Sequence, residues 1–210
     1  MIQRKGKIVS SINEKNIKAY DKKADNYNNT ADGKFTEKFK KLLSENIVMD
    51  DNASVLDVGC GNGTLLSKLS QVKKINGFGT DISPQMIKNA STRHPEFNFT
   101  VSDCENIPFG DQSMDIITVC AAYHHFPDVD AFALESNRII KPNGSLYIAE
   151  IRLPAIIRPI ANLFLPFSKD GDVKFYSAKE IANTFSSAGF SFVKVIKKGH
   201  IQIVQLQKNE

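Results

Sequence analysis

The sequence lacks the features that mark membrane-spanning, secreted and disulfide-bonded proteins. No apolar run approaches the roughly 20 residues that a spanning helix needs, and the first residues, MIQRKGKIVSSINEK, contain basic side chains but no apolar core of a secretory signal. The three cysteines, Cys60, Cys104 and Cys120, are odd in number and form no CxxC pair, which argues against a disulfide framework and a zinc site. These absences predict a cytoplasmic protein with no stable membrane insertion and no metal.

Excess positive charge is missing from most of the chain. Residues 1–50 hold 11 Lys and Arg against 7 Asp and Glu, whereas residues 51–210 hold 16 of each, so the net charge of +4 belongs to the first segment. An enzyme that acts on nucleic acid usually carries a broad basic footprint around its cleft. We therefore expect no nucleic-acid partner.

Repeats and low-complexity tracts are also absent from the 210 residues, and the length suits a single fold unit. Apolar residues recur at helical spacing over 17–27 and 35–47, which predicts two helices laid over the rest of the fold. We expect residues 1–50 to form a helical extension that covers a cofactor site, and residues 51–210 to form the main domain. Tyr20 and Tyr27 in the extension could present a hydroxyl to a ligand.

Apolar periodicity from residue 53 onward predicts strands in alternation with helices. The expected strands are 53–59, 75–82, 97–103, 114–121 and 144–151, and the expected helices are 64–69, 84–92 and 129–140. Such alternation implies parallel strands joined by crossovers. A capping box at Ser177 begins a last helix, and the runs 190–198 and 200–207 around Gly199 predict an antiparallel hairpin. The predicted fold is an α/β, doubly wound, Rossmann-like sheet of seven mostly parallel strands, with a C-terminal antiparallel hairpin and helices on both faces.

The stretch VLDVGCGNG, residues 55–63, packs three glycines into five positions at the end of the first predicted strand. Glycine tolerates positive φ and lets the backbone approach a ligand closely. Asp81 follows Gly61 by twenty residues, at the end of the second strand, where a carboxylate accepts hydrogen bonds from ribose hydroxyls. The turn and the aspartate together indicate a nucleoside-containing ligand at the carboxyl edge of the sheet.

Two classes of cofactor contain such a nucleoside. A nicotinamide or flavin dinucleotide site has a third glycine at the position where this chain has Thr64. The charge of Asp57 would be poorly placed beside a pyrophosphate, but it suits a cofactor with ammonium and sulfonium groups. These residues favour S-adenosyl-L-methionine, and they leave an NAD-dependent oxidoreductase and a non-catalytic cofactor-binding module as alternatives.

The ordered motifs DVGCGNG, GTDIS, SDCENIPF, YHHF and IKPNG resemble those of the class I S-adenosylmethionine-dependent methyltransferases, and the chain is most similar to the subgroup of the ubiquinone and menaquinone biosynthesis methyltransferases. The resemblance implies S-adenosyl-L-methionine as the cofactor and S-adenosyl-L-homocysteine as its product. It also implies a set of cofactor-binding residues, which are Tyr27, Asp57, Gly59, Cys60, Gly61, Asp81, Ile82, Met86, Asp103, Cys104 and Ala121.

The resemblance gives these residues separate roles. It implies Asp57, Gly59, Gly61 and Ala121 for the methionine end, Asp81 for the ribose, Ile82, Met86, Asp103 and the backbone of Cys104 for the adenine, and Tyr27 as a cover. The side chain of Cys60 is expected to be a small buried filler, because no second cysteine or basic activator adjoins it in sequence.

His124 and His125, in the stretch AAYHHFPD, follow the fourth predicted strand and should emerge at the same edge of the sheet. Methyl transfer from a sulfonium needs mainly alignment and exclusion of water, and a general base helps when the acceptor is a hydroxyl or a carbon acid. Either histidine could be the catalytic base. The alternative is that one orients the loop through hydrogen bonds and the other is exposed.

The predicted acceptor is a small, apolar organic molecule. No Asn/Asp-Pro-Pro-Tyr/Phe motif, which amino-methylating DNA enzymes use, follows the fourth strand. The segment LPAIIRPIANLFLPF, residues 153–167, is apolar, rich in proline and too short to span a bilayer. It indicates a lid over a quinone-like or lipid-like acceptor; ordinary packing or a dimer contact is the alternative, so a monomer and a homodimer both stay open.

Overall fold

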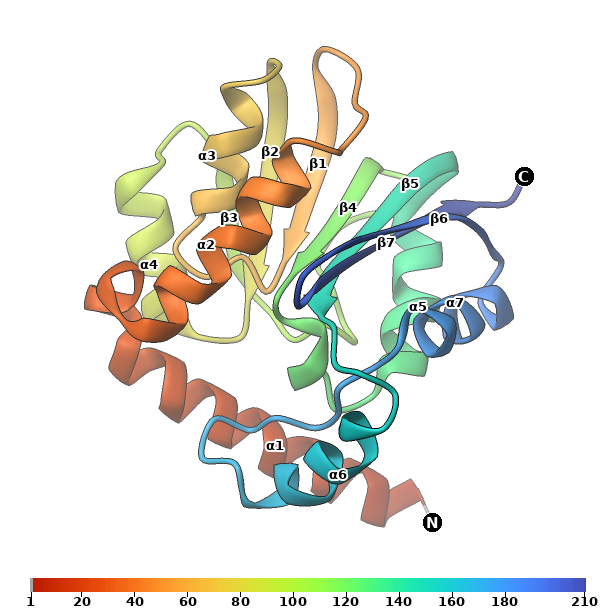
Figure 1. Ribbon diagram of the computed structural model, residues 1–210. Helices are drawn as coiled ribbons and strands as arrows, with labels where there is room; N and C mark the ends of the chain where they lie inside the picture. Colours follow the sequence, from red (N-terminus) through yellow and green to blue (C-terminus); the bar gives the residue numbers. More distant parts are fainter. Residues whose placement is uncertain (1) are drawn as a thin grey trace.

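A single seven-stranded sheet organises the computed structural model, which describes residues 2–210, although not the side-chain surroundings of residues 2–8 and 166. The strands lie in the order β3-β2-β1-β4-β5-β7-β6 (Figure 1). Their bounds are β1 Ala53–Val58, β2 Ile75–Asp81, β3 Asn98–Val101, β4 Met114–Cys120, β5 Ile140–Ile151, β6 Phe190–Lys198 and β7 Ile201–Lys208. The pairs among β1 to β5 are parallel, whereas β7 runs antiparallel to both β5 and β6. The predicted doubly wound sheet with a closing antiparallel hairpin is confirmed.

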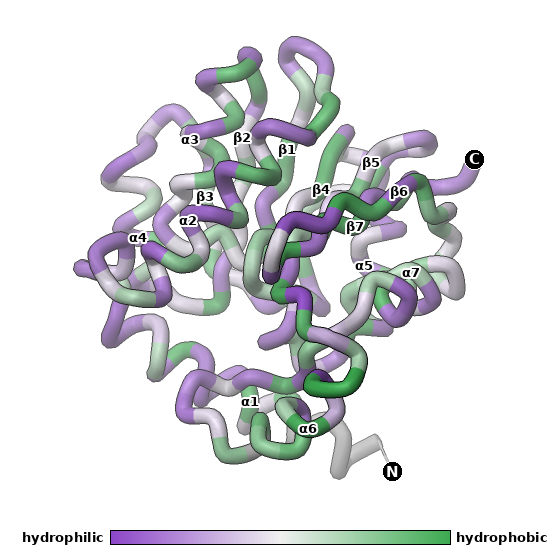
Figure 2. Tube along the Cα trace, viewed as in Figure 1, coloured by the Kyte–Doolittle hydropathy of each residue, from purple (hydrophilic) through white to green (hydrophobic). Residues whose placement is uncertain are grey.

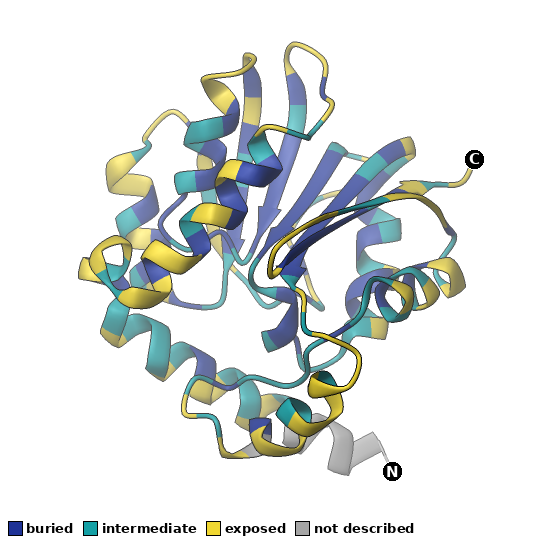
Figure 3. Ribbon diagram, viewed as in Figure 1, coloured by how far each residue is buried: buried dark blue, intermediate teal, exposed yellow. Residues whose placement is uncertain are grey.

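Helices cover both faces of the sheet, and each face has its own apolar core. The helices are α1 Ile2–Lys23, α2 Ala31–Ser44, α3 Thr64–Ser70, α4 Pro84–Arg93, α5 Val129–Ile139, α6 Ile157–Phe164 and α7 Ala178–Ser187. Alternate residues of β5 point to opposite faces: Leu146 joins the core beneath α5 and α7, whereas Tyr147 joins the core beneath α2 and α3. Figure 3 shows the resulting layer of buried residues in the strands between the two sets of helices.

Two helix starts follow their local sequence signals. The Ser83 hydroxyl accepts a hydrogen bond from the backbone N–H of Met86, with Pro84 in the first turn of α4. Ser177 and Glu180 form the predicted capping box at the start of α7. Gly189, at φ +87°, follows the end of that helix. These local predictions hold because the groups that satisfy the helix ends lie within three residues.

The N-terminal region differs from its predicted helices. α1 ends at Lys23, and Tyr27 lies in a separate 3-10 turn, η1 Ala24–Asn29, before Thr30 caps α2. Asparagines favour turns over helix interiors because their side chains bond locally, and Asn29 donates to Asn26 at 2.7 Å in this turn. α2 packs on the sheet, whereas α1 contacts α4 and η1 and crosses below the carboxyl ends of the strands (Figure 1).

The apolar segment predicted over 153–167 forms α6 followed by a 3-10 turn, η3 Leu165–Phe167. It leaves the sheet at the end of β5 and lies at the same end of the molecule as α1 (Figure 1). Within residues 2–210, none of the helices combines the length and apolarity required to span a bilayer.

Candidate functional site

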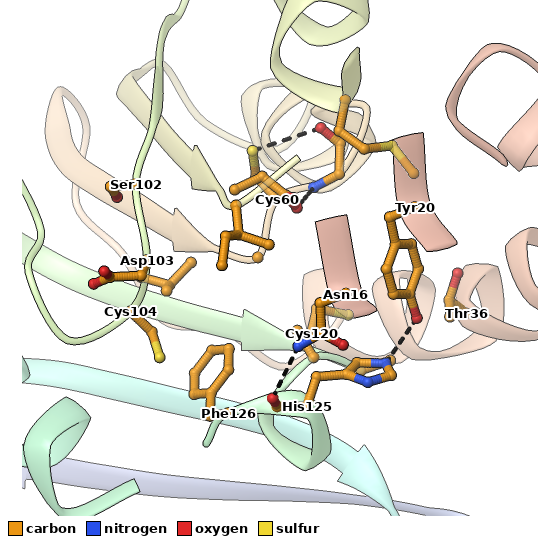
Figure 4. Close-up of a pocket in the computed structure, with 18 of the residues that line it drawn as sticks. Asn16, Tyr20, Thr36, Cys60, Ser102, Asp103, Cys104, Cys120, His125 and Phe126 are labelled. Atoms are coloured by element: carbon orange, nitrogen blue, oxygen red, sulfur yellow. Dashed lines mark hydrogen bonds between the residues drawn. The ribbon is translucent and has the colours of Figure 1, made fainter. Parts of the chain in front are cut away.

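One pocket opens at the carboxyl edge of the parallel strands, which is where ligands bind in open α/β sheets. Residues from the N-terminal helices form one wall, and the ends of β1, β2, β3 and β4 form the other (Figure 4). Its lining residues are Asn13, Asn16, Tyr20, Tyr27, Thr36, Lys40, Val58, Gly59, Cys60, Gly61, Asn62, Asp81, Ile82, Met86, Ser102, Asp103, Cys104, Cys120, Ala121, Ala122, His125, Phe126 and Pro127. All residues predicted to bind the cofactor line this pocket except Asp57. His125 also lines it, whereas His124 does not.

The glycine turn has positive φ at Gly59 and Gly61, and at Gly59 it also leaves no room for a Cβ. The backbone N–H groups of Gly59 and Cys60 both donate to the carbonyl of Thr80, at 2.8 and 2.9 Å, which ties the turn to the end of β2. Gly59 has φ +73°, and a Cβ there would lie 2.6 Å from the Cβ of Ala122. At Gly61, with φ +52°, a Cβ would have room beside Met86. Both glycines line the pocket, so the backbone itself forms its wall at these positions.

Asp81 connects the turn to the start of α4. Its Oδ2 accepts the N–H of Gly61 at 2.8 Å and its Oδ1 accepts the N–H of Ser83 at 2.9 Å. Burial raises the pKa of Asp81. The two N–H donors stabilise the ionised form and act in the opposite direction, but burial outweighs them. A carboxylate held in this way faces the pocket in a fixed orientation.

Asp57 lies beneath the turn at the end of β1. It is buried and accepts a hydrogen bond from the Thr118 hydroxyl at 2.9 Å. Burial raises the pKa of Asp57 to about 7, although Thr118 and the charge of Lys40 oppose the rise. A cationic group entering from the pocket side would favour the ionised form of this carboxyl.

The segment after β3 supplies the far end of the pocket. Asp103 Oδ1 accepts backbone N–H groups from Glu105 and Asn106, at 3.0 and 2.7 Å, which fixes the turn around Cys104. The Cys104 side chain is buried. Figure 4 shows Asp103 and Cys104 at the opposite end of the pocket from Tyr20 and His125.

Ala121 directly follows β4 and has an unusual backbone for a residue with a Cβ. Its φ is +53°, and its N–H donates to the carbonyl of Ala149 at 2.8 Å. A left-handed conformation costs an L-residue roughly 1–2 kcal/mol. Such strain persists where the surrounding structure fixes it, and here it turns the chain from the sheet toward His125.

Several buried polar atoms of the lining have no hydrogen-bond partner within residues 2–210. They are Oδ1 of Asn16, Oδ1 of Asn62, Oγ of Ser102 and Nδ1 of His125. A buried polar group without a partner costs roughly 1–3 kcal/mol. Their position on one pocket fits a polar ligand that would complete their bonding, as the ribose and amino-acid groups of S-adenosylmethionine would.

Of the two histidines, His125 faces the pocket. Its Nε2 lies 2.7 Å from the Tyr20 hydroxyl (Figure 4). Its Nδ1 lies 3.2 Å from Asp172 Oδ1 without a hydrogen bond. Burial and the neighbouring charge of His124 hold the pKa of His125 well below its usual range. Burial also raises the pKa of Tyr20. A neutral imidazole and a neutral phenol therefore meet at the pocket wall.

His124 points away from the pocket into the fold. Its Nδ1 lies 2.9 Å from both carboxylate oxygens of Glu150, and its backbone N–H donates to Glu150 Oε2 at 3.0 Å. Burial acts to lower the pKa of His124, but the carboxylates of Glu150 and Asp172 outweigh burial and raise it. Its imidazolium form pairs with both acids, so His124 fixes the turn that presents His125. The side chain of His124 is 8% exposed and that of His125 is 11% exposed. The alternative prediction, in which one of the two histidines is exposed to solvent, is therefore wrong in that respect.

Ligand atoms of His124, His125 and Asp172 lie within 4.8 Å of one another, a spacing that a metal ion could bridge. The sequence predicts no metal. The bonds described above engage Nδ1 of His124 with Glu150 and Nε2 of His125 with Tyr20, whereas Nε2 of His124 and Nδ1 of His125 face Asp172 Oδ1 at 3.6 and 3.2 Å.

The sequence did not single out Thr36 and Lys40, two pocket residues from α2. Both are buried, and Lys40 Nζ donates to the Thr36 hydroxyl at 3.2 Å. A signal existed, because Thr36 and Lys40 share the helix face of Leu43, so the pair interrupts an apolar stripe. Asn16 and Phe126 were also missed, and they carry no comparable signal.

Residues 56–148 match a family model described as a methyltransferase domain. Demethylmenaquinone methyltransferase of Chlorobaculum parvum is 29% identical over 139 residues, which are 66% of this chain and 54% of that protein. The chain therefore spans about half the length of the first curated relatives it matches. An uncharacterized methyltransferase of Synechocystis is 23% identical and aligns over 83% of this chain and 84% of its own length.

Among solved structures, the methyltransferase in complex with the Trm112 methyltransferase activator of Haloferax volcanii superposes with a TM-score of 0.81. It covers 91% of this chain and 98% of that chain at 20% identity, a likeness that shows the fold alone.

Proposed function

Because this chain belongs to the class I S-adenosylmethionine-dependent methyltransferases, with distant homology to the quinone methyltransferases, we propose that it transfers the cofactor's methyl group to a small, apolar organic acceptor. One observation carries the proposal: a single pocket joins the glycine turn, Asp81 and Asp103 at one end to His125 at the other. The family match disfavours the NAD-dependent oxidoreductase.

The cofactor occupies the pocket along the strand ends in this proposal. Asp81 takes the ribose hydroxyls, and Asp103 takes the adenine amino group beside the backbone of Cys104. Ile82 and Met86 flank the adenine, and the turn of Gly59, Cys60 and Gly61 passes the methionine end, with Ala121 opposite and Tyr27 as the cover. Support comes from the lining, which contains all of these residues.

The methionine end of the cofactor carries an ammonium and a carboxylate, and the chain offers a complementary pair. The buried Lys40 ammonium lines the pocket, and the buried Asp57 carboxyl lies beneath it. We assign Lys40 to the cofactor carboxylate and Asp57 to its ammonium. Charges in a low-dielectric site attract more strongly than in water, so this pairing also fixes the direction of the bound cofactor.

S-adenosylmethionine, when bound, supplies a methyl group already activated on a sulfonium. The work left to the chain is to align the acceptor, exclude water and take a proton. His125 is neutral, and its Nε2 is paired with the Tyr20 hydroxyl at 2.7 Å, so the acceptor's proton passes through that hydroxyl: Tyr20 gives its own proton to Nε2 and takes the acceptor's. Asp172 lies where it can stabilise the imidazolium that forms. His124 is a positioning residue in this scheme.

The acceptor class rests on the apolar surroundings of His125. Ala122, Phe126 and Pro127, which adjoin His125 in the sequence, line the same pocket. The relative from Chlorobaculum parvum is named as a demethylmenaquinone methyltransferase, and one from Rickettsia felis as a ubiquinone/menaquinone biosynthesis C-methyltransferase. A quinol-like molecule, apolar and with an ionisable hydroxyl, fits both the pocket and the base. The proposed reaction involves no nucleic-acid partner. It also needs only one copy of the chain.

Incubation of the purified protein with methyl-labelled S-adenosylmethionine and pooled lipid and metabolite extracts tests the proposal. The expected result is a labelled product in the apolar fraction, identified by mass. Label in polar products alone would overturn the acceptor class. Binding of S-adenosylhomocysteine with no transfer to any extract would identify a non-catalytic binding module instead.

A further inference from the structure

The segment around α6 exposes a continuous apolar face. Ile156, Ile160 and Leu163 are 85%, 59% and 70% exposed, and Ile157, Phe164 and Phe167 are also exposed. At 100° per residue the five positions from 156 to 164 fall on one side of the helix, and Phe167 follows in the 3-10 turn η3. Figures 2 and 3 show the segment as hydrophobic and exposed. Monomeric proteins rarely leave apolar patches of this kind without a use.

The opposite face of α6 holds the helix in this orientation. Arg158 pairs with Glu180 at 3.4 Å, and Asn162 exchanges two hydrogen bonds with the backbone of Phe175, at 3.1 and 2.8 Å. Leu165, just after the helix, is buried. The polar side chains therefore face the protein and the apolar ones face outward, which is the reverse of a helix that packs on a core.

Strong positive charge lies at the same end of the molecule. The sequence of α1 holds seven Lys and Arg against two Asp and Glu, and four of the seven, at positions 15, 18, 22 and 23, have side chains that the structure describes. The chain that follows α6 packs on α1, where Lys23 pairs with Asp170 at 2.7 Å and Gly171 lies against the Asn16 side chain. Figure 1 shows α1 and α6 at this end. An outward apolar helix is thus tied to the most basic helix of the chain.

We propose that α6 and α1 together form a docking surface for an anionic lipid bilayer. An amphipathic helix lies in the membrane interface with its apolar face among the acyl chains, while nearby basic residues attract the anionic headgroups. α6 has eight residues, so it is about 12 Å long and can lie in the interface but not cross it.

The charge of α1 favours a bilayer over a second copy of this chain. A two-fold dimer through this face would place identical surfaces against each other. The basic α1 helices of the two copies would then approach, and like charges repel. An anionic bilayer complements both the apolar face and the basic helix.

The position of α6 connects docking to the pocket. The chain enters the segment just after Glu150, which holds His124, and leaves it through Asp172, which lies beside His125. A docked α6 would therefore place the His125 end of the pocket near the membrane. Docking itself does not rest on the proposed function, since it needs only the apolar face and the charge.

Flotation of the full chain with lipid vesicles tests the proposal. We expect the protein to float with vesicles of phosphatidylcholine and phosphatidylglycerol, to bind phosphatidylcholine vesicles more weakly, and to dissociate as salt is raised. The double variant Leu163→Ser and Phe164→Ser should weaken binding by at least about tenfold, because it removes two inserting side chains. The double variant Lys15→Gln and Lys18→Gln, at exposed positions of α1, should weaken anionic binding by about tenfold.

Leu134→Ser is the matched control, since Leu134 on α5 is 64% exposed and belongs to another helix. It should float as the wild type does. Absence of the wild-type protein from both kinds of floated vesicle would overturn the proposal, whether or not the variants fold. So would a wild-type dimer that the Leu163→Ser and Phe164→Ser variant turns into a monomer. S-adenosylhomocysteine affinity, measured in parallel, should be unchanged in every variant, which separates a failure of docking from a failure of the proposed function.

Discussion

The two ends of the pocket differ in how far apart in the sequence their contacting residues lie. At the cofactor end, which comprises the strand-end segments from Gly59 to Cys104, the bond from Gly61 to Asp81 joins residues 20 positions apart. At the acceptor end, which comprises Tyr20, His124, His125, Glu150 and Asp172, the Tyr20–His125 contact joins residues 105 positions apart. Consecutive strands and turns assemble the first end, whereas separate parts of the chain must converge to build the second. We expect the first end to respond to backbone changes and the second to charge changes.

The largest effect is expected from Gly59→Ala at the cofactor end. The new Cβ would meet Ala122 at 2.6 Å in a backbone with φ +73°. Strain and overpacking together should lower the free energy of unfolding by on the order of 4 kcal/mol, and S-adenosylhomocysteine binding should be lost. Chemical denaturation and calorimetry measure the two effects. Gly110→Ala is the control, because a Cβ there meets nothing within 4 Å; equal behaviour of the two variants would refute the steric account of the turn.

A charge change at the acceptor end should act next most strongly. Glu150→Gln removes the charge that pairs with His124 and should cost about 3 kcal/mol of unfolding free energy, because it breaks a buried ion pair. Methyl transfer should fall with it, while S-adenosylhomocysteine affinity stays near that of the wild type. The control is Glu96→Gln, whose carboxylate lies 3.9 Å from His94 and is half exposed. Loss of cofactor affinity in Glu150→Gln would show that the two ends are not separable.

Asp57→Asn should change the free energy of unfolding by a smaller amount and in the opposite direction, so that the variant is more stable than the wild type. The pKa of Asp57 is raised in the folded protein to about 7, so the folded state binds a proton that the unfolded state has already lost. Stability should therefore decrease as pH rises from the usual value of 3.8 toward 7. The variant should remove that part of the pH dependence and stabilise the cofactor-free protein at neutral pH by roughly 2 kcal/mol. Its cofactor affinity should fall, because the ammonium loses its partner.

Thermal unfolding of the wild type and of Asp57→Asn at about pH 5 and about pH 6, below the range where His124 contributes, separates the two contributions. The raised pKa of His124 makes its stabilisation fade only as pH rises above 6.5 and through its folded value. A wild-type protein whose stability does not change over the lower window would contradict the role of Asp57.

The sequence predicted the strands and turns that form the cofactor end, because their determinants are local. Strand order, the capping residues and the turn from Gly59 to Gly61 follow from short patterns with known backbone needs. The distinction between His124 and His125 could not be predicted, since it depends on Glu150 and Asp172, which reach the turn from other parts of the fold. Lys40 was hidden on a mostly apolar face. The periodicity of α6 was readable, but which side faces solvent depends on the bonds of Asn162 to Phe175.

The most direct test of the account is a paired measurement on His125→Asn, with the exposed His200→Asn as the control. Both variants should bind S-adenosylhomocysteine within about twofold of the wild type. His125→Asn should lose methyl transfer by a factor of roughly 100 or more, as expected for removal of a general base, whereas His200→Asn should retain it. Unchanged transfer in His125→Asn would contradict the assignment of the acceptor end to this histidine.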